Sequence, residues 1–249
     1  MKQKWVLITG ASSGIGAACA KKLGEMGYNL ILTGRRKERL EELANNIKAG
    51  ETLVASFDLQ KPGEIESFCA RHEAYLKKLD VLINNAGLAK GNEKVDEGSV
   101  KDWDLMIDTN VKGLMHMTRG VLPHMVAKKE GHIVNLGSVA GRWTYPGGAV
   151  YCASKFAVRA FTEGLRMDLQ GKNIRVTNVE PGMVNTEFSL VRMGSKEKAE
   201  AVYQGMTPLK AEDIADTVAW VLLRPTHVNI QEIVIYPTDQ AHVGMVHRS

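Results

Sequence analysis

The sequence lacks the features that mark several large classes of protein. Its three cysteines, Cys19, Cys69 and Cys152, form an odd and dispersed set, which argues against a disulfide framework and favours a reducing cytoplasm. No apolar run reaches the ~20 residues of a membrane span. The seven histidines show no HExxH or similar ligand spacing, so we expect no catalytic metal. The start of the chain has no basic block followed by a long apolar stretch, so we expect no signal peptide.

Charge is also close to balanced. The formal net charge is +4, and the basic excess is spread along the chain without a dense block, which argues against a nucleic-acid partner. Hydrophobic residues make up 44% of the chain and charged residues 24%, as in ordinary globular proteins. We therefore expect a small-molecule partner rather than a nucleic acid or a membrane.

Short apolar runs with strand character alternate with longer amphipathic segments. Strands are predicted at 5–8, 29–33, 52–57, 81–84, 131–136, 175–179 and 233–235. Helices are predicted at about 14–26, 37–49, 65–76, 99–129, 151–170 and 211–223. This alternation predicts an α/β protein: a single-domain Rossmann fold over residues 1–249, with a doubly wound parallel sheet of about seven strands and helices on both faces.

One segment departs from the alternation. Residues from Pro181 to about Pro208 lack a clear strand and are rich in glycine and methionine. Loops of this kind often cover functional sites. We interpret residues 183–208 as a substrate-side lid, with short helices.

A glycine-rich turn follows the first predicted strand. Its spacing is Gly10-x3-Gly14-x-Gly16, rather than the commoner Gly-x-Gly-x2-Gly. Backbone N–H groups at the start of a helix attract anions, so the turn suits a phosphate or a dinucleotide. Gly10 suits the tight turn, Gly14 a close approach to the phosphates, and Gly16 close packing of helix on strand. The alternative is a turn with a purely structural role.

The residues at the end of the second predicted strand indicate which dinucleotide the turn binds. Proteins that bind NAD usually have a carboxylate at this position, which binds the ribose hydroxyls. This chain instead has Arg35 and Arg36. Arginine offers paired hydrogen bonds to a phosphate. We predict that Arg35, with or without Arg36, binds the 2′-phosphate of NADP. The alternative is a solvated basic start to the next helix.

A third pattern indicates proton transfer. Tyr151 and Lys155 are four residues apart on a predicted helix and therefore share one face, and Ser138 lies thirteen positions upstream. A free tyrosine titrates near pH ~10, and a neighbouring cation favours the phenolate. Lys155, helped by a cationic cofactor ring, is expected to lower the pKa of Tyr151. By itself the Tyr-x3-Lys spacing also fits a half-buried tyrosine beside a solvated lysine.

Taken together, these motifs resemble the short-chain dehydrogenase/reductase family. The matching positions fall in family order and span almost the whole chain. They are Thr9-Gly10-x3-Gly14-Ile15-Gly16, Asp58, Asn84-Asn85-Ala86-Gly87, Asn110, Ser138, Tyr151-x3-Lys155 and Pro181-Gly182.

The resemblance implies roles for the matching residues. Tyr151 would be the general acid/base, Ser138 would polarise the substrate carbonyl, Lys155 would also hold the nicotinamide ribose, and Asn110 would hold a water chain leading to Lys155. The implied cofactor contacts are Gly10, Ser12, Ser13, Gly14, Ile15, Gly16, Arg35, Arg36, Asp58, Leu59, Asn85, Ala86, Gly87, Tyr151, Lys155, Pro181, Gly182, Val184 and Thr186. Asp58 and Asn110 also fit simpler roles, as a turn residue and a polar group inside a helix.

A narrower similarity is to the NADP-dependent 3-hydroxy acid dehydrogenases, including those that act on serine and allo-threonine. It rests on segments 33–40, 84–89, 103–110, 180–184 and 228–230 and on the final His247-Arg248. It implies a small acid with a β-hydroxyl, oxidised to a 3-oxo acid or semialdehyde. The expected substrate contacts are Ser138 and Tyr151, with Arg142 or Arg192 binding the carboxylate.

Other functions remain open at this stage. A reductase of 3-oxoacyl thioesters, a sugar or polyol dehydrogenase and a general carbonyl reductase share the same motifs. A non-enzymatic NADPH-binding sensor is the alternative from a different class, although it would not need the proton-transfer set. The family resemblance also implies a homotetramer, whereas the apolar helix faces alone fit an ordinary core.

Overall fold

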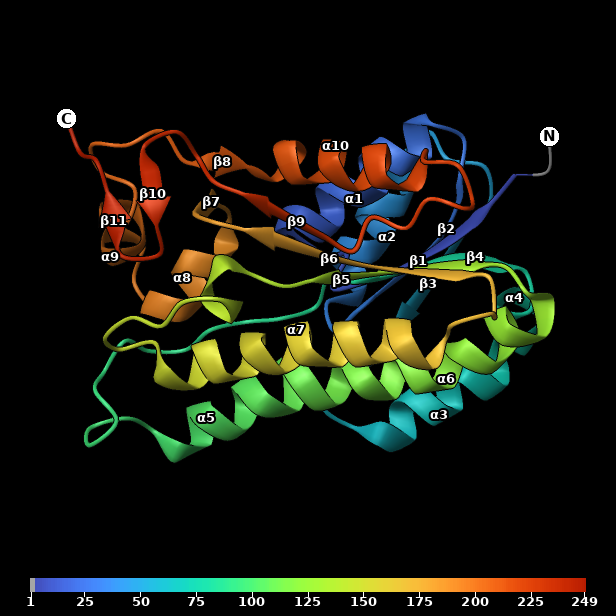
Figure 1. Cartoon of the computed structure of the whole chain (residues 1–249), viewed down its shortest axis with the longest axis horizontal. Coiled ribbons are helices and arrows are strands. Elements are labelled where there is room, and N and C mark those ends of the chain that lie inside the picture. Colours follow the sequence, from blue (N-terminus) through green and yellow to red (C-terminus); the bar gives the residue numbers. More distant parts are fainter. Residues whose placement is uncertain (1–2) are drawn as a thin grey trace.

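The computed structural model describes residues 3–249. Seven parallel strands form the central sheet in the order β3-β2-β1-β4-β5-β6-β9 (Figure 1). They are β1 (Trp5–Thr9), β2 (Asn29–Gly34), β3 (Thr52–Ser56), β4 (Leu79–Asn84), β5 (Gly131–Leu136), β6 (Ile174–Pro181) and β9 (Glu232–Ile235). The predicted sheet and its seven strands are confirmed.

Helices cover both faces of this sheet (Figure 1). One face carries α1 (Gly14–Glu25), α2 (Lys37–Asn46) and α10 (Ala211–Leu222). The other carries α3 (Pro62–Arg71), α4 (Glu73–Leu76), α5 (Val100–Ile107), α6 (Leu114–Lys128) and α7 (Ala149–Asp168). Alternate residues of a strand face opposite sides, so Val6 and Ile8 enter one buried cluster while Trp5 and Leu7 enter the other.

The predicted helix over 99–129 is one continuous helical stretch with a defect in its middle. Between α5 and α6, residues Asp108–Gly113 form a π-helical turn. Such turns are rare and often occur at functional sites. The other predicted helix with a break is 65–76, which divides at His72 into α3 and α4.

The segment 183–208 contains more regular structure than predicted. It holds the two helices α8 (Glu187–Met193) and α9 (Lys196–Ala201), as expected, but also the short strand β7 (Val184–Asn185). β7 pairs in parallel with β8 (Leu209–Lys210), outside the main sheet. We call residues 183–208 the covering segment, because it lies over the carboxyl edge of the sheet (Figure 1).

The end of the chain was not predicted to be regular. Strands β10 (Gln240–His242) and β11 (Met245–Val246) form a small antiparallel pair. Beyond them, the backbone N–H of Ser249 donates to the carbonyl of Gly205 at 2.9 Å, so the C-terminus contacts the covering segment.

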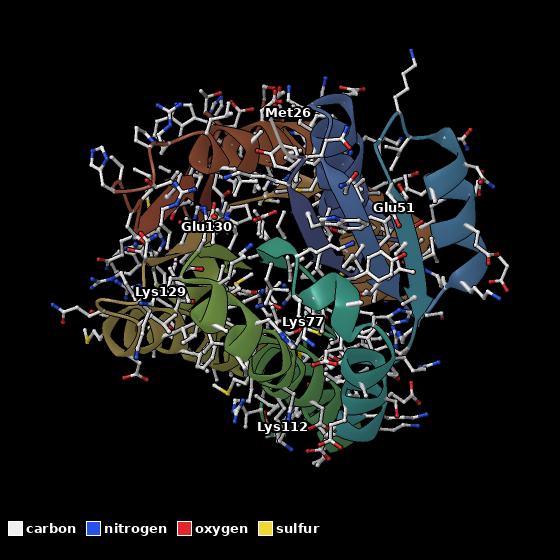
Figure 2. The ribbon with its side chains drawn as sticks, turned by 90° about the vertical axis from the view of Figure 1, so that its right-hand side faces the viewer. Met26, Glu51, Lys77, Lys112, Lys129 and Glu130 are labelled. Carbon is white, nitrogen blue, oxygen red and sulfur yellow. The ribbon has the colours of Figure 1, made fainter. Side chains whose placement is uncertain are left out.

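The two edges of the sheet differ in character. Figure 2 looks onto the amino edge, where Met26, Glu51, Lys77 and Glu130 lie in the connections that lead into β2, β3, β4 and β5. The opposite, carboxyl edge carries the glycine-rich turn, Ser138 and the covering segment. In open α/β sheets, ligands bind at that edge. No helix within residues 3–249 has the length and apolar character needed to cross a membrane.

Candidate active site

A cavity of about 340 Å³ runs along the carboxyl ends of the central strands. It is lined by the connections after β1, β2, β3, β4, β5 and β6 and by the covering segment. Every cofactor contact predicted from the sequence lines this cavity except Gly16. Residues from six connections thus meet in one place, as the parallel topology requires.

The glycine-rich turn forms one wall of the cavity. Gly10 and Gly14 have positive φ angles of 66° and 53°, which side chains disfavour. A Cβ on Gly10 would lie 2.8 Å from the Cα of Ala86, and one on Gly16 would lie 2.5 Å from the Gly10 carbonyl oxygen. Gly16 therefore does not line the cavity but allows α1 to pack closely against the glycine-rich turn. Asn85 braces the same turn by donating to the carbonyls of Thr9 and Gly10 at 2.9 and 3.2 Å.

The two arginines after β2 have different surroundings. Arg36 donates to the hydroxyls of Ser12 and Ser13 at 3.1 and 2.5 Å and pairs with Glu187 at 2.8 Å. The Arg35 side chain lines the cavity and has no hydrogen bond or ion pair to another residue of the described chain, 3–249. Arg35 is thus the guanidinium that is available to a phosphate.

Ser138, Tyr151 and Lys155 converge at the other end of the cavity. Each side chain is buried, with exposed fractions of 9%, 9% and 6%. The Lys155 ammonium donates to the Leu136 carbonyl at 2.8 Å and lies 5.9 Å from the centre of the Tyr151 ring. Ser138 begins the short helix η2 (Val139–Gly141), and its hydroxyl accepts from the Ala140 N–H at 3.1 Å. The structure therefore brings the predicted trio together.

The pKa values of Tyr151 and Lys155 differ from the expectation that Lys155 lowers the pKa of Tyr151. Burial raises the pKa of the Tyr151 phenol, and a hydrogen bond with Ser138 and the charge of Arg192 oppose this only in part. Burial also lowers the pKa of Lys155 from 10.5 to about 8, although Glu180 opposes the change. Lys155 alone thus does not lower the pKa of Tyr151. A tyrosine that keeps its proton is suited to donate it.

Asn110 lies in the π-helical turn, behind the cavity. Its amide accepts from the Leu88 N–H and donates to the Leu88 carbonyl, both at 2.8 Å, and it donates to the Ser154 hydroxyl at 3.0 Å. A Cβ on Gly87 would lie 3.2 Å from the Asn110 amide oxygen and 3.6 Å from the Lys155 nitrogen. Asn110 thus holds the loop after β4 against α7, close to Lys155.

Comparisons with known proteins identify the family of this chain. The family model described as short chain dehydrogenase matches residues 4–195. The chain belongs to the short-chain dehydrogenase family. It is 49% identical to the NADP-dependent 3-hydroxy acid dehydrogenase YdfG of Salmonella typhi, over 98% of this chain and 99% of that protein. It is 46% identical to sulfoacetaldehyde reductase 2 of Chromohalobacter salexigens, over 95% of both chains.

A solved structure extends the comparison to the fold. The closed form of serine dehydrogenase complexed with NADP+ superposes with a TM-score of 0.93, at 46% identity. The match covers 98% of this chain and 100% of that one. As a short-chain dehydrogenase, the protein is an oxidoreductase, which confirms the predicted family and enzyme class.

Arg142 of this dehydrogenase is already paired with two carboxylates. Its guanidinium forms ion pairs with Glu180 and Glu232, and neither Arg142 nor Arg192 is among the residues that line the cavity. Its charge is therefore already neutralised. We correct the expectation that Arg142 binds substrate.

Arg192 lies on α8, beside Tyr151. Its guanidinium donates to the Gly91 carbonyl at 3.0 Å and to the Tyr145 hydroxyl at 2.8 Å, and lies 5.9 Å from the centre of the Tyr151 ring. It forms no ion pair with any carboxylate of residues 3–249. A positive charge next to Tyr151 is thus held by neutral groups alone.

Three residues at this site were missed by the sequence argument. Tyr145 orients Arg192, Phe188 packs on Tyr151 with ring centres 5.6 Å apart, and Glu187 pairs with Arg36. None belongs to a motif. Glu187 and Phe188 reach the site because the covering segment lies over the sheet, whereas Tyr145 lies in the connection between η2 and α7. The sequence carried no signal for them.

Proposed function

We propose that the protein is an NADP-dependent dehydrogenase that interconverts small 3-hydroxy acids with 3-oxo acids or semialdehydes. The observation that carries this proposal is the Arg192 guanidinium, without a carboxylate partner, beside the Ser138, Tyr151 and Lys155 set. The names of the relatives support the cofactor and the substrate class.

The residues of the cavity suit NADP. The N–H groups at the start of α1 face the cavity, and the Ser13 side chain makes no cap hydrogen bond there, so these donors are available to a diphosphate. Arg35, together with the Ser12 and Ser13 hydroxyls, suits the 2′-phosphate. Lys155 lies at the opposite end, where it can bind the nicotinamide ribose. When bound, NADPH supplies the hydride for the reduction.

Tyr151 and Ser138 act on the substrate oxygen. Tyr151 donates its proton to the carbonyl oxygen during reduction and takes it back during oxidation. Ser138 donates a hydrogen bond to the same oxygen and stabilises the charge that develops on it. Lys155 holds a positive charge next to the phenol, and Phe188 helps to exclude water from it. We propose that the covering segment acts as a lid over this arrangement.

Arg192 selects the substrate. A 3-hydroxy acid carries its carboxylate two carbons from the reacting carbon, so one end reaches Arg192 while the other meets Tyr151. A carboxylate would add charged hydrogen bonds to a guanidinium that now binds only neutral oxygens. A sulfonate fits the same site, which agrees with the relative named as a sulfoacetaldehyde reductase.

The test is initial-rate absorbance at 340 nm with NADP or NAD on L-serine, L-allo-threonine, 3-hydroxypropionate, 3-hydroxyisobutyrate and polyols, with sulfoacetaldehyde and NADPH in the reverse direction. We expect turnover with NADP and the acids, and loss of at least tenfold in kcat/KM for the acids in Arg192→Gln. The matched control is Arg166→Gln, on α7. Equal activity on polyols and acids, or no effect of Arg192→Gln, would contradict the substrate proposal.

We further propose a cytoplasmic homotetramer. Cys19, Cys69 and Cys152 are all free thiols, which suits a reducing compartment. Phe156 and Met167 on α7 are 39% and 55% exposed and suit an interface between subunits. Sedimentation of the purified protein tests the assembly, and a monomer would contradict it.

A further inference from the structure

Glu187 links the covering segment to the basic side chains after β2. It is the first residue of α8, and its two carboxylate oxygens pair with different arginines. One oxygen lies 2.8 Å from Arg36 and the other 2.7 Å from Arg39. These pairs join residues about 150 positions apart in the sequence, and both Glu187 and Arg36 line the cavity.

Arg36 continues this link to the glycine-rich turn. Its remaining nitrogens donate to the hydroxyls of Ser12 and Ser13, so one guanidinium contacts both the turn and the covering segment. Nearby, Thr186 lies close to the turn, since a Cβ on Gly14 would lie 3.3 Å from the Thr186 Cβ. The start of α8 is therefore held directly above the turn where the cofactor phosphates are expected.

The position of Arg39 indicates that the link to Glu187 has a role other than phosphate binding. It does not line the cavity, and the hydrogen bond from its side chain goes to Glu187. Arg35, by contrast, lines the cavity and has no partner among the described residues. The neighbouring arginines thus divide into one that faces the cavity freely and two that hold Glu187.

We propose that Glu187, Arg36 and Arg39 form an ionic latch that fastens the covering segment over bound NADP(H) and slows cofactor release. Glu187 is a positioning residue in this scheme, because it acts through the covering segment and not on the reacting atoms. The inference rests on cofactor binding in this cavity but not on the proposed substrate. The ion pairs are partly exposed, with side chains 42% to 49% accessible, so their effect is modest.

Simple electrostatics makes the opposite prediction. A carboxylate close to Arg36 would repel or compete with the 2′-phosphate, so its removal would strengthen NADPH binding and leave NADH unchanged. A latch instead acts on the whole cofactor, so its loss speeds the release of both. Two results therefore decide between a latch and simple repulsion. The first is whether removal of the Glu187 charge speeds or slows cofactor release, and the second is whether NADH, which lacks the 2′-phosphate, is affected as NADPH is.

The experiment measures dissociation of NADPH and of NADH by stopped-flow, using the fluorescence of the reduced nicotinamide. We expect Glu187→Gln and Arg39→Gln each to raise both dissociation rates by about threefold to tenfold. The double variant should release the cofactor no faster than Glu187→Gln, because the pair that Arg39→Gln removes is already lost in Glu187→Gln. Glu200→Gln is the control, because Glu200 forms a comparable surface pair with Lys196 on α9 at 3.7 Å.

Two outcomes would overturn the latch: tighter binding of NADPH alone in Glu187→Gln, or dissociation rates unchanged from wild type. Arg35→Gln provides the contrast, since it should weaken NADPH and spare NADH. No substrate is present in these measurements, so their result is separate from the substrate test. Failure of the wild-type protein to bind NADPH would instead count against the proposed cofactor site.

Discussion

Arg142 and Glu180 form an ion pair, and neither residue is among those that line the cavity. The Glu180 side chain is fully buried and accepts from the Arg142 Nε. Glu180 also accepts from Asn178 at 2.7 Å, while Glu232 pairs with Arg159 at 2.9 Å. Two carboxylates and two guanidiniums thus connect η2, β6, α7 and β9. Arg142 follows Ser138 by four positions, Arg159 lies one turn beyond Lys155, and Glu180 precedes Pro181. This network therefore connects the elements that carry Ser138 and Lys155.

Breaking this pair should therefore destabilise the protein strongly. Arg142→Met leaves a buried carboxylate short of a partner and should lower the free energy of unfolding by about 3–5 kcal/mol. The double variant Arg142→Met with Glu180→Gln should cost clearly less than the sum of the two single variants. Urea unfolding measures all three. Additive losses would show that the two side chains do not interact.

The buried ammonium of Lys155 should lower the stability of the protein at neutral pH. Its pKa in the folded protein is about 8, against 10.5 as its ordinary value, so between these values the unfolded chain binds more protons. The stability that this group contributes is therefore fully present above pH 10.5 and is lost as the pH falls through 8. The full difference corresponds to about 3 kcal/mol. Lys155→Met should be inactive yet about 1–3 kcal/mol more stable at pH 7.

The pH dependence of that gain separates charge from packing. The stability difference between Lys155→Met and wild type should shrink as the pH rises from 8 to 10, in urea unfolding without cofactor. Lys172→Met replaces an exposed lysine and serves as the control. A gain that stays constant with pH would assign the effect to packing instead.

His132 should make the protein sensitive to acid. It is 2% exposed, and burial, aided by Arg175 and Lys4, lowers its pKa from 6.5 to about 3. Its Nε2 lies 2.8 Å from the Thr177 hydroxyl, which itself donates to the Ile230 carbonyl, so Nε2 is the donor. In the unfolded chain this histidine binds a proton below pH 6.5, whereas in the folded protein it binds one only below about pH 3. Stability is therefore lost as the pH falls across this window.

The variant His132→Gln removes this titration and keeps a side-chain donor. The loss of stability between pH 7 and pH 5 should be smaller than in wild type by about 2 kcal/mol. Unfolding by urea at the two pH values gives the comparison. His116→Gln alters an exposed histidine of α6 and should behave like wild type. An identical acid response in His132→Gln would disprove the assignment.

Asn110 offers a test of the π-helical turn. Asn110→Ala removes the partner of the Leu88 N–H and carbonyl, both buried, and should cost about 2–4 kcal/mol in unfolding free energy. The neighbouring Thr109 has a buried hydroxyl with no partner in the described chain. Thr109→Val keeps the shape of that side chain and should be neutral or slightly stabilising. Equal losses in both variants would point to a general defect of the turn.

Much of the fold and part of the site followed from local sequence patterns. The strands are short apolar runs, and the predicted sheet needs only such runs separated by helices. The π-helical turn at Asp108–Gly113 was not predicted, because no local pattern of residues marks it; its Asn110 contacts Leu88 and Ser154 on other elements. Motif residues such as Tyr151 and Lys155 were predictable, because a single helix sets their spacing.

The charged residues show where sequence reasoning stopped. Arg142 and Arg192 looked equivalent as candidates for a carboxylate, yet one is neutralised by Glu180 and the other faces Tyr151. The partners that decide this lie 38 and 101 positions away in the chain. The sequence by itself determined the order of elements, the flexible glycines and the types of reactive side chain, since these depend on neighbours along the chain. Only the tertiary structure decided which charges are free, because the electrostatic surroundings of a side chain depend on distant segments that folding brings together.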